Sequence, residues 1–286
     1  IILLKKLLIY ALDLKLDPYN VELVILNNEE YSYNSEVPKT HSRKDWNNFI
    51  YNNEFANYDD DFSFWIHWIK KIKPARVLEI GIGNGRLIKL LSNTVSQYDG
   101  LDISQNIINK FIEKNSWYKG NLFNQDMKDI NINTIYDLII LPFNTFCYLY
   151  TLDDLKRFFT GIKKISNSNT IIIIDIINPN INDMSEQKKY KLCNHFIINN
   201  EMCKLYEKHY YDYDTEVINY SKKYVFSNGK IMKFNLPVRI FFHQELLNLF
   251  NLFGFEIINI LGDYNNENYK FNSRKQIVFI KRSDKK

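Results

Sequence analysis

The chain has 286 residues, of which 45% are hydrophobic and 24% are charged, so it can bury a full core. Its 37 basic and 33 acidic residues leave a formal net charge of +4 without a long run of one sign, which neither indicates nor excludes nucleic acid or an anionic membrane. Cys147, Cys193 and Cys203 are scattered without a C-x-x-C spacing. This argues against a disulfide framework or a zinc site and predicts buried, reduced thiols in a cytoplasmic protein.

The first 50 residues are predicted to form a helical extension and linker, ahead of a main domain at residues 51–286. The opening stretch IILLKKLLIYALDLKL is apolar, but charged residues interrupt it before about 18 apolar residues accumulate. An amphipathic helix is therefore expected there. Residues 27–50 are polar and show no sustained period, which favours a linker.

Helices and strands then alternate along the chain. Residues 59–71 are predicted to form a helix that ends before Pro74, with Phe62, Trp65, Ile66 and Ile69 on its apolar face. Apolar runs beyond it predict a parallel sheet covered on both faces. The expected strands are residues 75–80, 97–102, 121–125, 136–141 and 170–175. The expected helices are residues 85–92, residues 104–114 and one capped by Thr151, where Asp154 gives a near match to a capping box.

The pattern changes between about residues 189 and 242, where an antiparallel insertion is predicted. From about residue 202 the sequence alternates at period two, with Leu205, Glu207, His209 and Tyr211 on one face. The turn SNG at 227–229 should join two long strands. A helix at 244–253, stopped by Gly254, and the strands FEIINIL and KQIVFIKR close the domain.

Residues 77–91, VLEIGIGNGRLIKLL, place three glycines at a strand-to-helix turn. Glycine allows a positive φ and close approach of a ligand, while a helix N-terminus offers N–H groups to an anion. A dinucleotide loop would need glycine at position 86, which is arginine, and no G-K-[ST] follows to make a Walker loop. The observed spacing is E-x-G-x-G-x-G, from Glu79 to Gly85.

This motif resembles the first motif of the class I S-adenosylmethionine-dependent methyltransferases, and the resemblance covers about residues 55–282. It implies an α/β fold, a Rossmann-like seven-stranded sheet with an antiparallel β insertion forming a lid. It also implies S-adenosyl-L-methionine as cofactor and S-adenosyl-L-homocysteine as product. Asp102 matches the acid that binds the ribose hydroxyls, for which a carboxylate offers two acceptor oxygens. Asp126 and the backbone N–H of Met127 match the adenine contacts.

The segment LPFNTFCYL resembles the part of these enzymes that passes beside the sulfonium, and Tyr58 matches a tyrosine over the donor. Aromatic faces favour a cation, so Tyr58, Phe143 and Phe146 are candidates, with core packing favoured for Phe146. The full set expected to bind the cofactor is Tyr58, Glu79, Gly81, Gly83, Gly85, Asp102, Ile103, Asp126, Met127, Leu141 and Asn144.

The later segment FFHQELLNLFNLFGFEIINILGDY resembles the small-molecule branch, which includes amino-sugar N-methyltransferases and glycine or sarcosine methyltransferases. Nucleic-acid amino methyltransferases usually carry Asp or Asn, Pro, Pro and an aromatic residue where this chain has LPFN, which argues against adenine methylation. The expected acceptor is therefore a small molecule, with no nucleic-acid or membrane partner and with a homodimer as a possible assembly. Two alternatives stay open: a protein or RNA methyltransferase that docks through the N-terminal arm, and a non-catalytic donor-binding module.

Methyl transfer is an in-line displacement that gains most from alignment and exclusion of water, so no metal is expected. A general base is needed only if the acceptor is protonated, and His209, then His243, are the candidates. The residues expected to bind the acceptor are Phe143, Tyr148 and Arg239. Arg239 could anchor a carboxylate or phosphate of the acceptor or, equally, pair with an acid in the sheet.

Overall fold

The computed structural model describes residues 58–180, 184–198 and 201–283. The chain divides into two units, Ile1–Lys39 and Thr40–Lys286. The extension and linker predicted for residues 1–50 lie outside the described residues. In the part that is described, no helix is long and apolar enough to cross a membrane.

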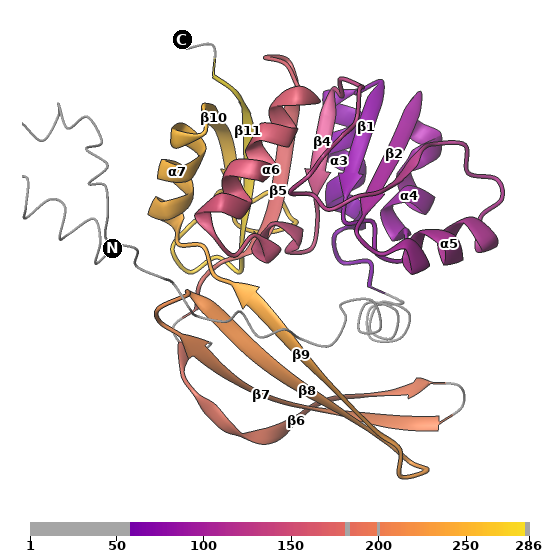
Figure 1. Ribbon diagram of the computed structural model, residues 1–286, viewed down its shortest axis with the longest axis vertical. Coiled ribbons are helices and arrows are strands. Elements are labelled where there is room, and N and C mark those ends of the chain that lie inside the picture. The colour runs from indigo at the N-terminus through magenta and orange to yellow at the C-terminus, as the bar shows by residue number, and fades with distance from the viewer. Residues whose placement is uncertain (1–57, 181–183, 199–200, 284–286) are drawn as a thin grey trace, which may run out of the picture. The chain divides into compact units, whose positions relative to one another are not determined.

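A seven-stranded sheet, sheet A, forms the centre of the second unit, as predicted. Its strand order is β10-β11-β5-β4-β1-β2-β3 (Figure 1). The first five strands along the chain are parallel, and β11 runs antiparallel to both β5 and β10. The strands are β1 Arg76–Ile80, β2 Gln97–Asp102, β3 Leu122–Asn124, β4 Leu138–Leu141, β5 Ile171–Ile177, β10 Phe255–Leu261 and β11 Lys275–Arg282.

Helices cover both faces of sheet A because alternate strand residues point to opposite sides. Leu78 and Ile139 pack in a core with α6 (Leu152–Lys164) and α7 (His243–Leu252). Their neighbours Val77 and Leu138 pack in a second core with α3 (Phe62–Ile72), α4 (Arg86–Leu91) and α5 (Gln105–Lys114). Apolar residues fill both cores, which is why the strands read as continuous apolar runs.

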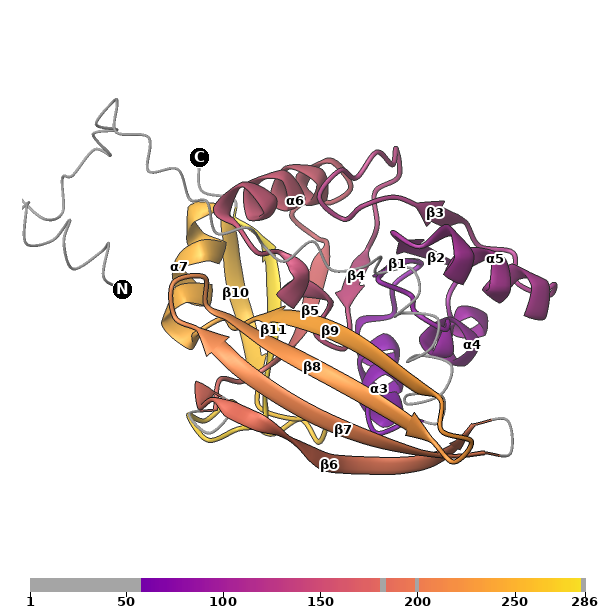
Figure 2. The ribbon, with the colours of Figure 1, turned by 60° about the horizontal axis from the view of Figure 1, so that its bottom comes forward.

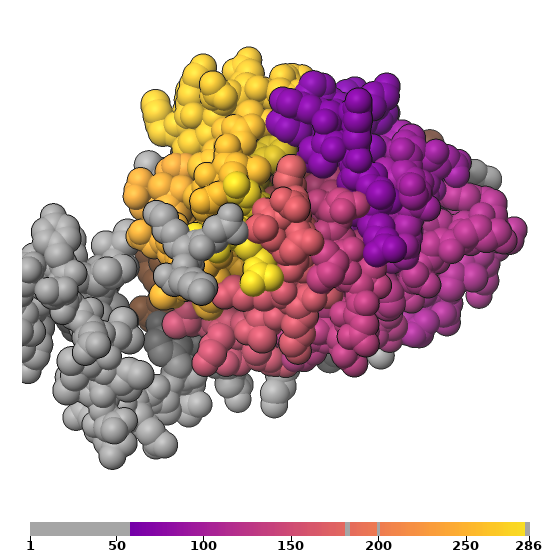
Figure 3. Space-filling view, turned by 90° about the horizontal axis from the view of Figure 1, so that it is seen from above, coloured from indigo at the N-terminus to yellow at the C-terminus, as the bar shows by residue number. Residues whose placement is uncertain are grey.

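The buried face of α3 differs in part from the prediction. The helix buries Phe64, Trp65, Trp68 and Ile69, whereas Phe62 and Ile66 are only partly buried. The reason is a contact with the far end of the chain: Trp68 lies 4.4 Å from Phe279 between ring centroids and donates a 2.7 Å hydrogen bond to Asn266. Figure 3 shows the indigo start of the described chain beside its yellow end.

Several local signals are confirmed. Thr151 and Asp154 form the capping box at the start of α6. Gly229, at φ +86°, lies in the turn that joins two strands, and Gly254, at φ +76°, follows the end of α7. In each place glycine adopts a left-handed backbone that other residues avoid.

The insertion is a separate antiparallel sheet, sheet B, with four strands in the order β6-β7-β8-β9 (Figure 2). They are β6 Gln187–Ile198, β7 Glu201–Asp212, β8 Val217–Phe226 and β9 Ile231–Arg239. The sequence did not predict β6 as a strand. Most of its side chains are exposed and two register shifts interrupt its pairing with β7, so no clean alternation marks it. Cys193 of β6 is exposed, which corrects its prediction as a buried thiol, whereas Cys147 and Cys203 are buried.

Candidate functional site

The glycine loop lies at the edge of sheet A where the parallel strands end, which is where open α/β sheets bind their ligands. Gly81, Gly83 and Gly85 all have positive φ, at +82°, +54° and +71°. The Gly81 amide donates a 2.7 Å hydrogen bond to the Leu101 carbonyl oxygen of β2. The loop is therefore fixed directly beside the end of the neighbouring strand.

Close packing explains part of the glycine requirement. A Cβ on Gly81 would lie 2.7 Å from Thr145 Oγ1, in the short helix Thr145–Tyr148 that follows β4. A Cβ on Gly85 would lie 2.2 Å from the ring of Phe111 on α5. The sequence analysis assigned these glycines to a positive φ and to ligand approach, and it missed both packing contacts because the partners are distant in the chain.

Asp102 ends β2 with a buried carboxylate, only 6% exposed as a residue. It accepts hydrogen bonds from the amides of Gly83, at 3.2 Å, and Ser104, at 2.9 Å. The side-chain amide of Asn124 donates hydrogen bonds to the carbonyl oxygens of Asp102 and Ile103, at 3.1 and 2.9 Å. The structure thus brings Asp102, Ile103 and the glycine loop together, and it adds Asn124, which the sequence analysis did not select.

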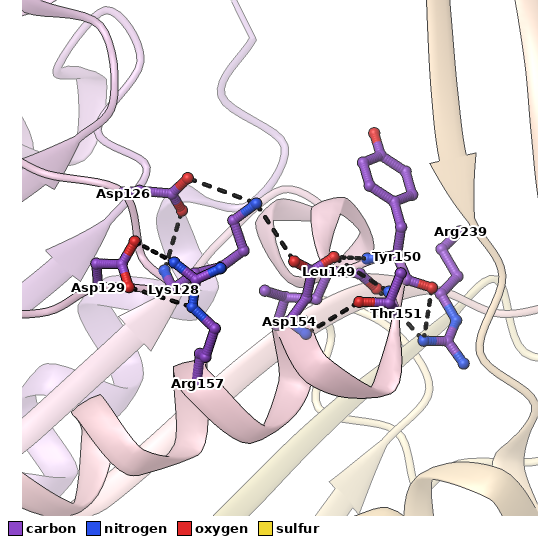
Figure 4. Close-up of polar contacts among 9 residues, drawn as sticks. All are labelled: Asp126, Lys128, Asp129, Leu149, Tyr150, Thr151, Asp154, Arg157 and Arg239. Atoms are coloured by element: carbon purple, nitrogen blue, oxygen red, sulfur yellow. Dashed lines mark hydrogen bonds and ion pairs between the residues drawn. The ribbon is translucent and has the colours of Figure 1, made fainter. Parts of the chain in front are cut away.

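Asp126 follows β3 and lies among basic and acidic side chains (Figure 4). Its carboxylate accepts a 3.0 Å hydrogen bond from the Lys128 amide and lies 3.6 Å from Lys128 Nζ. Lys128 Nζ also lies 3.3 Å from Asp154 Oδ1 on α6. The neighbouring Met127 is largely buried, so its side chain belongs to the core.

The exit of β4 is strained. Leu141 is fully buried, and the next non-proline residues, Phe143 and Asn144, both adopt left-handed backbones at φ +52° and +64°. Such conformations cost about 1–3 kcal/mol for non-glycine residues and concentrate at functional sites. Asn144 Oδ1 is also buried and has no hydrogen-bond partner among the described residues. An unmet acceptor of this kind is suited to a ligand donor.

Asp175, fully buried in β5, holds this exit in place. Its carboxylate accepts hydrogen bonds from the Phe143 amide at 2.9 Å and the Tyr264 hydroxyl at 2.7 Å, and it pairs with Lys275 Nζ at 2.8 Å. A side-chain hydrogen bond links Tyr264 to Tyr58, whose burial raises its pKa to about 12. Sequence reasoning passed over Asp175, although an acid closing the apolar run TIIIID was the available signal.

Glu79 lies at the end of β1 and is almost fully buried. Its carboxyl group accepts a 3.0 Å hydrogen bond from the Tyr98 hydroxyl. Burial raises the pKa of Glu79 to about 8, and this outweighs the opposing effects of Tyr98 and of the Arg86 charge. Most Glu79 side chains are therefore protonated at neutral pH.

Arg239 is already engaged within the protein. Its guanidinium pairs with Glu245 at 2.7 Å and Glu216 at 3.8 Å and donates to the Tyr150 carbonyl oxygen at 3.1 Å. Arg239 thus pairs with acids of the protein, but not with one in the sheet as expected, because Glu245 belongs to α7 and Glu216 precedes β8. A role of Arg239 in binding the acceptor stays a prediction. The other expected acceptor residues, Phe143 and Tyr148, lie partly buried at the exit of β4.

The histidines differ in their surroundings. His243 Nδ1 lies 3.1 Å from Gln276 Oε1, and its ring stacks on Tyr269. His209 projects from β7 with its ring centroid 5.6 Å from Tyr220, and both of its ring nitrogens are buried without a hydrogen-bond partner in the described residues.

Phe146 is fully buried in the core, as favoured. Within the described ranges, no cluster of His, Cys, Asp and Glu could hold a metal ion.

Comparisons with known proteins agree with the fold described above. Residues 77–169 match the family model of a methyltransferase domain. No curated protein matches the chain. Among solved structures, an S-adenosylmethionine-dependent methyltransferase from Clostridium acetobutylicum is 17% identical, with a TM-score of 0.68 over 84% of this chain and 98% of the other.

Two further structures share the fold. The CcbJ methyltransferase from Streptomyces caelestis is 16% identical, with a TM-score of 0.67 over 78% of this chain and 90% of that one. CalS10, an amino pentose methyltransferase from Micromonospora echinaspora, is 12% identical, with a TM-score of 0.63 over 79% and 92%. Residues 77–169 are therefore similar to a methyltransferase domain, and the described chain shares the fold of these solved S-adenosylmethionine-dependent methyltransferases.

Proposed function

We propose that this chain transfers a methyl group from S-adenosylmethionine to a nitrogen or oxygen atom of a small molecule. The observation that carries the donor assignment is the contact of Asp102 with the glycine loop. A buried carboxylate at the end of β2 accepts hydrogen bonds from the Gly83 and Ser104 amides. A carboxylate at this strand end offers two acceptor oxygens, the group that suits the paired hydroxyls of a ribose.

The other residues proposed to contact S-adenosylmethionine lie along the same edge of sheet A, where its parallel strands end. Gly81, Gly83 and Gly85 supply a backbone that the methionine end of the donor can approach, beside the buried Glu79. Asp126 and the Met127 amide would hold the adenine. Asn144 Oδ1, buried and without a partner among the described residues, would accept a donor N–H or O–H, and Leu141 and Ile103 would supply apolar walls.

A small-molecule acceptor is supported by the kind of protein that shares the fold. CalS10 is described as an amino pentose methyltransferase and KedS8, from Streptoalloteichus, as a sugar N-methyltransferase. Sheet B would form the lid over the acceptor, with Phe143 and Tyr148 at the β4 exit as further contacts. His209 would accept the proton of an acceptor that is protonated, since its ring nitrogens have no described partner.

The bound donor supplies an electrophilic methyl group on a sulfonium, and the residues of this chain would align it and exclude water. In-line displacement needs no covalent intermediate with the protein. The strained β4 exit, fixed by Asp175, and the ring of Tyr58 would set that alignment. Rate enhancement would therefore depend on positions of rings and backbone more than on a single acid or base.

The donor assignment is tested by calorimetric titration of S-adenosylmethionine into the wild-type protein and Asp102→Ala. Loss of two charge-assisted hydrogen bonds should weaken binding about 100-fold. Asp129→Ala is the matched control, because Asp129 is an exposed acid that pairs with Arg157 on the surface. An Asp102→Ala protein that stays folded and binds with wild-type affinity would contradict the assignment.

The acceptor class is tested with methyl-labelled S-adenosylmethionine and a metabolite extract of the source organism. Label should appear in molecules of low mass and depend on the wild-type site. Label recovered only in protein or RNA would replace the small-molecule proposal with a macromolecular one. Donor binding without label in any fraction would favour a non-catalytic module.

A further inference from the structure

Arg86 occupies a place that is electrostatically unfavourable for a cation. It is the first residue of α4, where the helix dipole carries partial positive charge. Its side chain, 14% exposed, forms a two-point ion pair with the fully buried carboxylate of Asp61, with Nη2 2.7 Å from Oδ2. Asp61 also accepts a 2.9 Å hydrogen bond from Trp65 Nε1. The pair therefore joins the start of α3 to the glycine loop.

Among the described residues, three aromatic rings lie near the Arg86 guanidinium. Its central carbon lies 5.2 Å from the ring centroid of Tyr58, 5.6 Å from that of Phe143 and 5.7 Å from that of Phe62. The rings of Tyr58 and Phe143 are themselves in edge contact, 4.8 Å apart. A cation at this distance from ring faces is attracted by each of them.

The two residues that carry these rings are also linked to Asp175. The Phe143 amide and the Tyr264 hydroxyl both donate to its carboxylate, and Tyr264 is hydrogen-bonded to Tyr58. Tyr58 and Phe143 are thus linked to two largely buried ion pairs, Asp61 with Arg86 and Asp175 with Lys275. Each pair sums to zero charge, so neither pair adds a net charge beside the two rings.

We propose that the Arg86–Asp61 pair determines how strongly the site prefers the cationic methyl donor over its neutral product. The pair positions Tyr58 and Phe143 and keeps the charge beside them close to zero. This inference rests on the proposed function, since it places S-adenosylmethionine beside these rings. Transfer of the methyl group converts the sulfonium to an uncharged thioether, so only the donor responds fully to a charge left at this pair.

The sign of each substitution follows. Neutralising Arg86 alone leaves the Asp61 carboxylate, which should favour the donor over the product. Neutralising Asp61 alone leaves the guanidinium, which should disfavour the donor. A unit charge roughly 10 Å away, at an effective dielectric constant of about 20, changes binding of a monovalent cation about tenfold.

The test is calorimetric measurement of the dissociation constants of S-adenosylmethionine and S-adenosylhomocysteine for Arg86→Gln, Asp61→Asn and the double variant. The product-to-donor ratio of dissociation constants should rise about tenfold in Arg86→Gln and fall about tenfold in Asp61→Asn. The double variant should return near the wild-type ratio. Because each ratio compares two ligands on one protein, a general loss of stability cancels.

The exposed pair Arg157 and Asp129 provides the control, and Arg157→Gln and Asp129→Asn should leave the ratio within about twofold of wild type. Ratios that stay unchanged, or move in the same direction, in Arg86→Gln and Asp61→Asn would overturn the inference while the proposed function stands. If Asp61→Asn does not fold, Arg86→Lys decides: it keeps the charge and should keep the wild-type ratio, whereas a shift as large as that of Arg86→Gln would overturn the inference. A wild-type protein that binds neither ligand would instead overturn the proposed function.

Discussion

Glu79 is a buried carboxyl group at the place where the methionine end of the donor is expected to bind. Burial raises its pKa to about 8, and the Tyr98 hydroxyl is its hydrogen-bond donor. A ligand ammonium group beside this carboxyl would favour the ionised form and lower the pKa. Donor binding should then release a proton, and the two events are thermodynamically coupled.

We expect the affinity for S-adenosylmethionine to rise as the pH increases from about 6 to about 8 and to level off above the raised pKa of Glu79. Calorimetry in buffers of different ionisation enthalpy measures the proton release directly. Glu79→Gln, which keeps the shape without the charge, should bind more weakly and show a flat profile. A wild-type profile that is also flat would exclude Glu79 as a donor contact.

The same shift affects folding with a definite sign. The unfolded carboxyl has a pKa near 4.5 and the folded one a pKa of about 8, so between these values the folded protein retains a proton that the unfolded chain releases. The free energy of unfolding therefore falls as the pH rises across this interval. The contribution of Glu79 to stability is complete below the unfolded pKa and is lost as the pH rises through the folded pKa. Because the donor would favour the ionised carboxylate, we expect it to stabilise the folded protein most at alkaline pH.

Among the structural elements, β9 makes polar contacts that tie sheet B to the helices beside sheet A. Arg239, near its end, pairs with Glu245 of α7 and donates to the Tyr150 carbonyl oxygen just before α6. The Tyr150 hydroxyl in turn donates to the Pro237 carbonyl oxygen at 3.0 Å. These bonds fix the base of the insertion beside the β4 exit, where Phe143 and Tyr148 lie.

We expect Arg239→Ala to lower the free energy of unfolding by about 3–5 kcal/mol, because it leaves the half-buried Glu245 without its partner. Chemical denaturation gives this value. Arg157→Ala removes an exposed pair with Asp129 and should cost less than about 1 kcal/mol. Equal losses in the two variants would mean that Arg239 does not anchor the insertion.

The sequence predicted those elements whose signals are local. The strands of sheet A are apolar runs between helices, and the capping box and the two turn glycines rest on neighbours three or four residues apart. β6 escaped prediction because its side chains are mostly exposed, and the face of α3 was shifted because Trp68 packs on Phe279. Contacts between distant segments carry no periodic signal.

The residues of the candidate site likewise fall into those that local sequence signals predict and those that only the fold brings together. Asp102 and the glycine loop follow strand ends that sequence periodicity locates, and the structure joins them by a hydrogen bond. Asp175, Tyr264 and Arg86 act on Phe143 and Tyr58 across the fold, so only their spatial arrangement reveals them. Arg86 was read only as a departure from the dinucleotide motif, although its charge is the feature that needs a partner.

At the scale of the whole molecule, the two sheets differ in how much apolar surface supports them. Sheet A lies between two large cores that share its strands, whereas the core confined to sheet B contains Ile198, Cys203, Leu205, Tyr224 and Phe226 as its buried members. Within the described ranges, β6 is also an edge strand, with β7 as its single partner. Local opening is easiest where few apolar contacts oppose it.

We therefore expect amide hydrogen exchange to be slowest in β4 and β5, at the rate of global unfolding, and at least tenfold faster in β6. Excess S-adenosylmethionine should slow exchange at residues 81–85 and 102–104 through binding to the folded state, and slow β6 less. Exchange in β6 as slow as in β5 would show that both sheets unfold as one unit. If adding the donor slowed exchange in sheet B alone, the donor would bind away from the glycine loop. Exchange measured with the donor alone therefore tests the donor site. Once an acceptor is identified, adding it to the same experiment should slow amide exchange in β6.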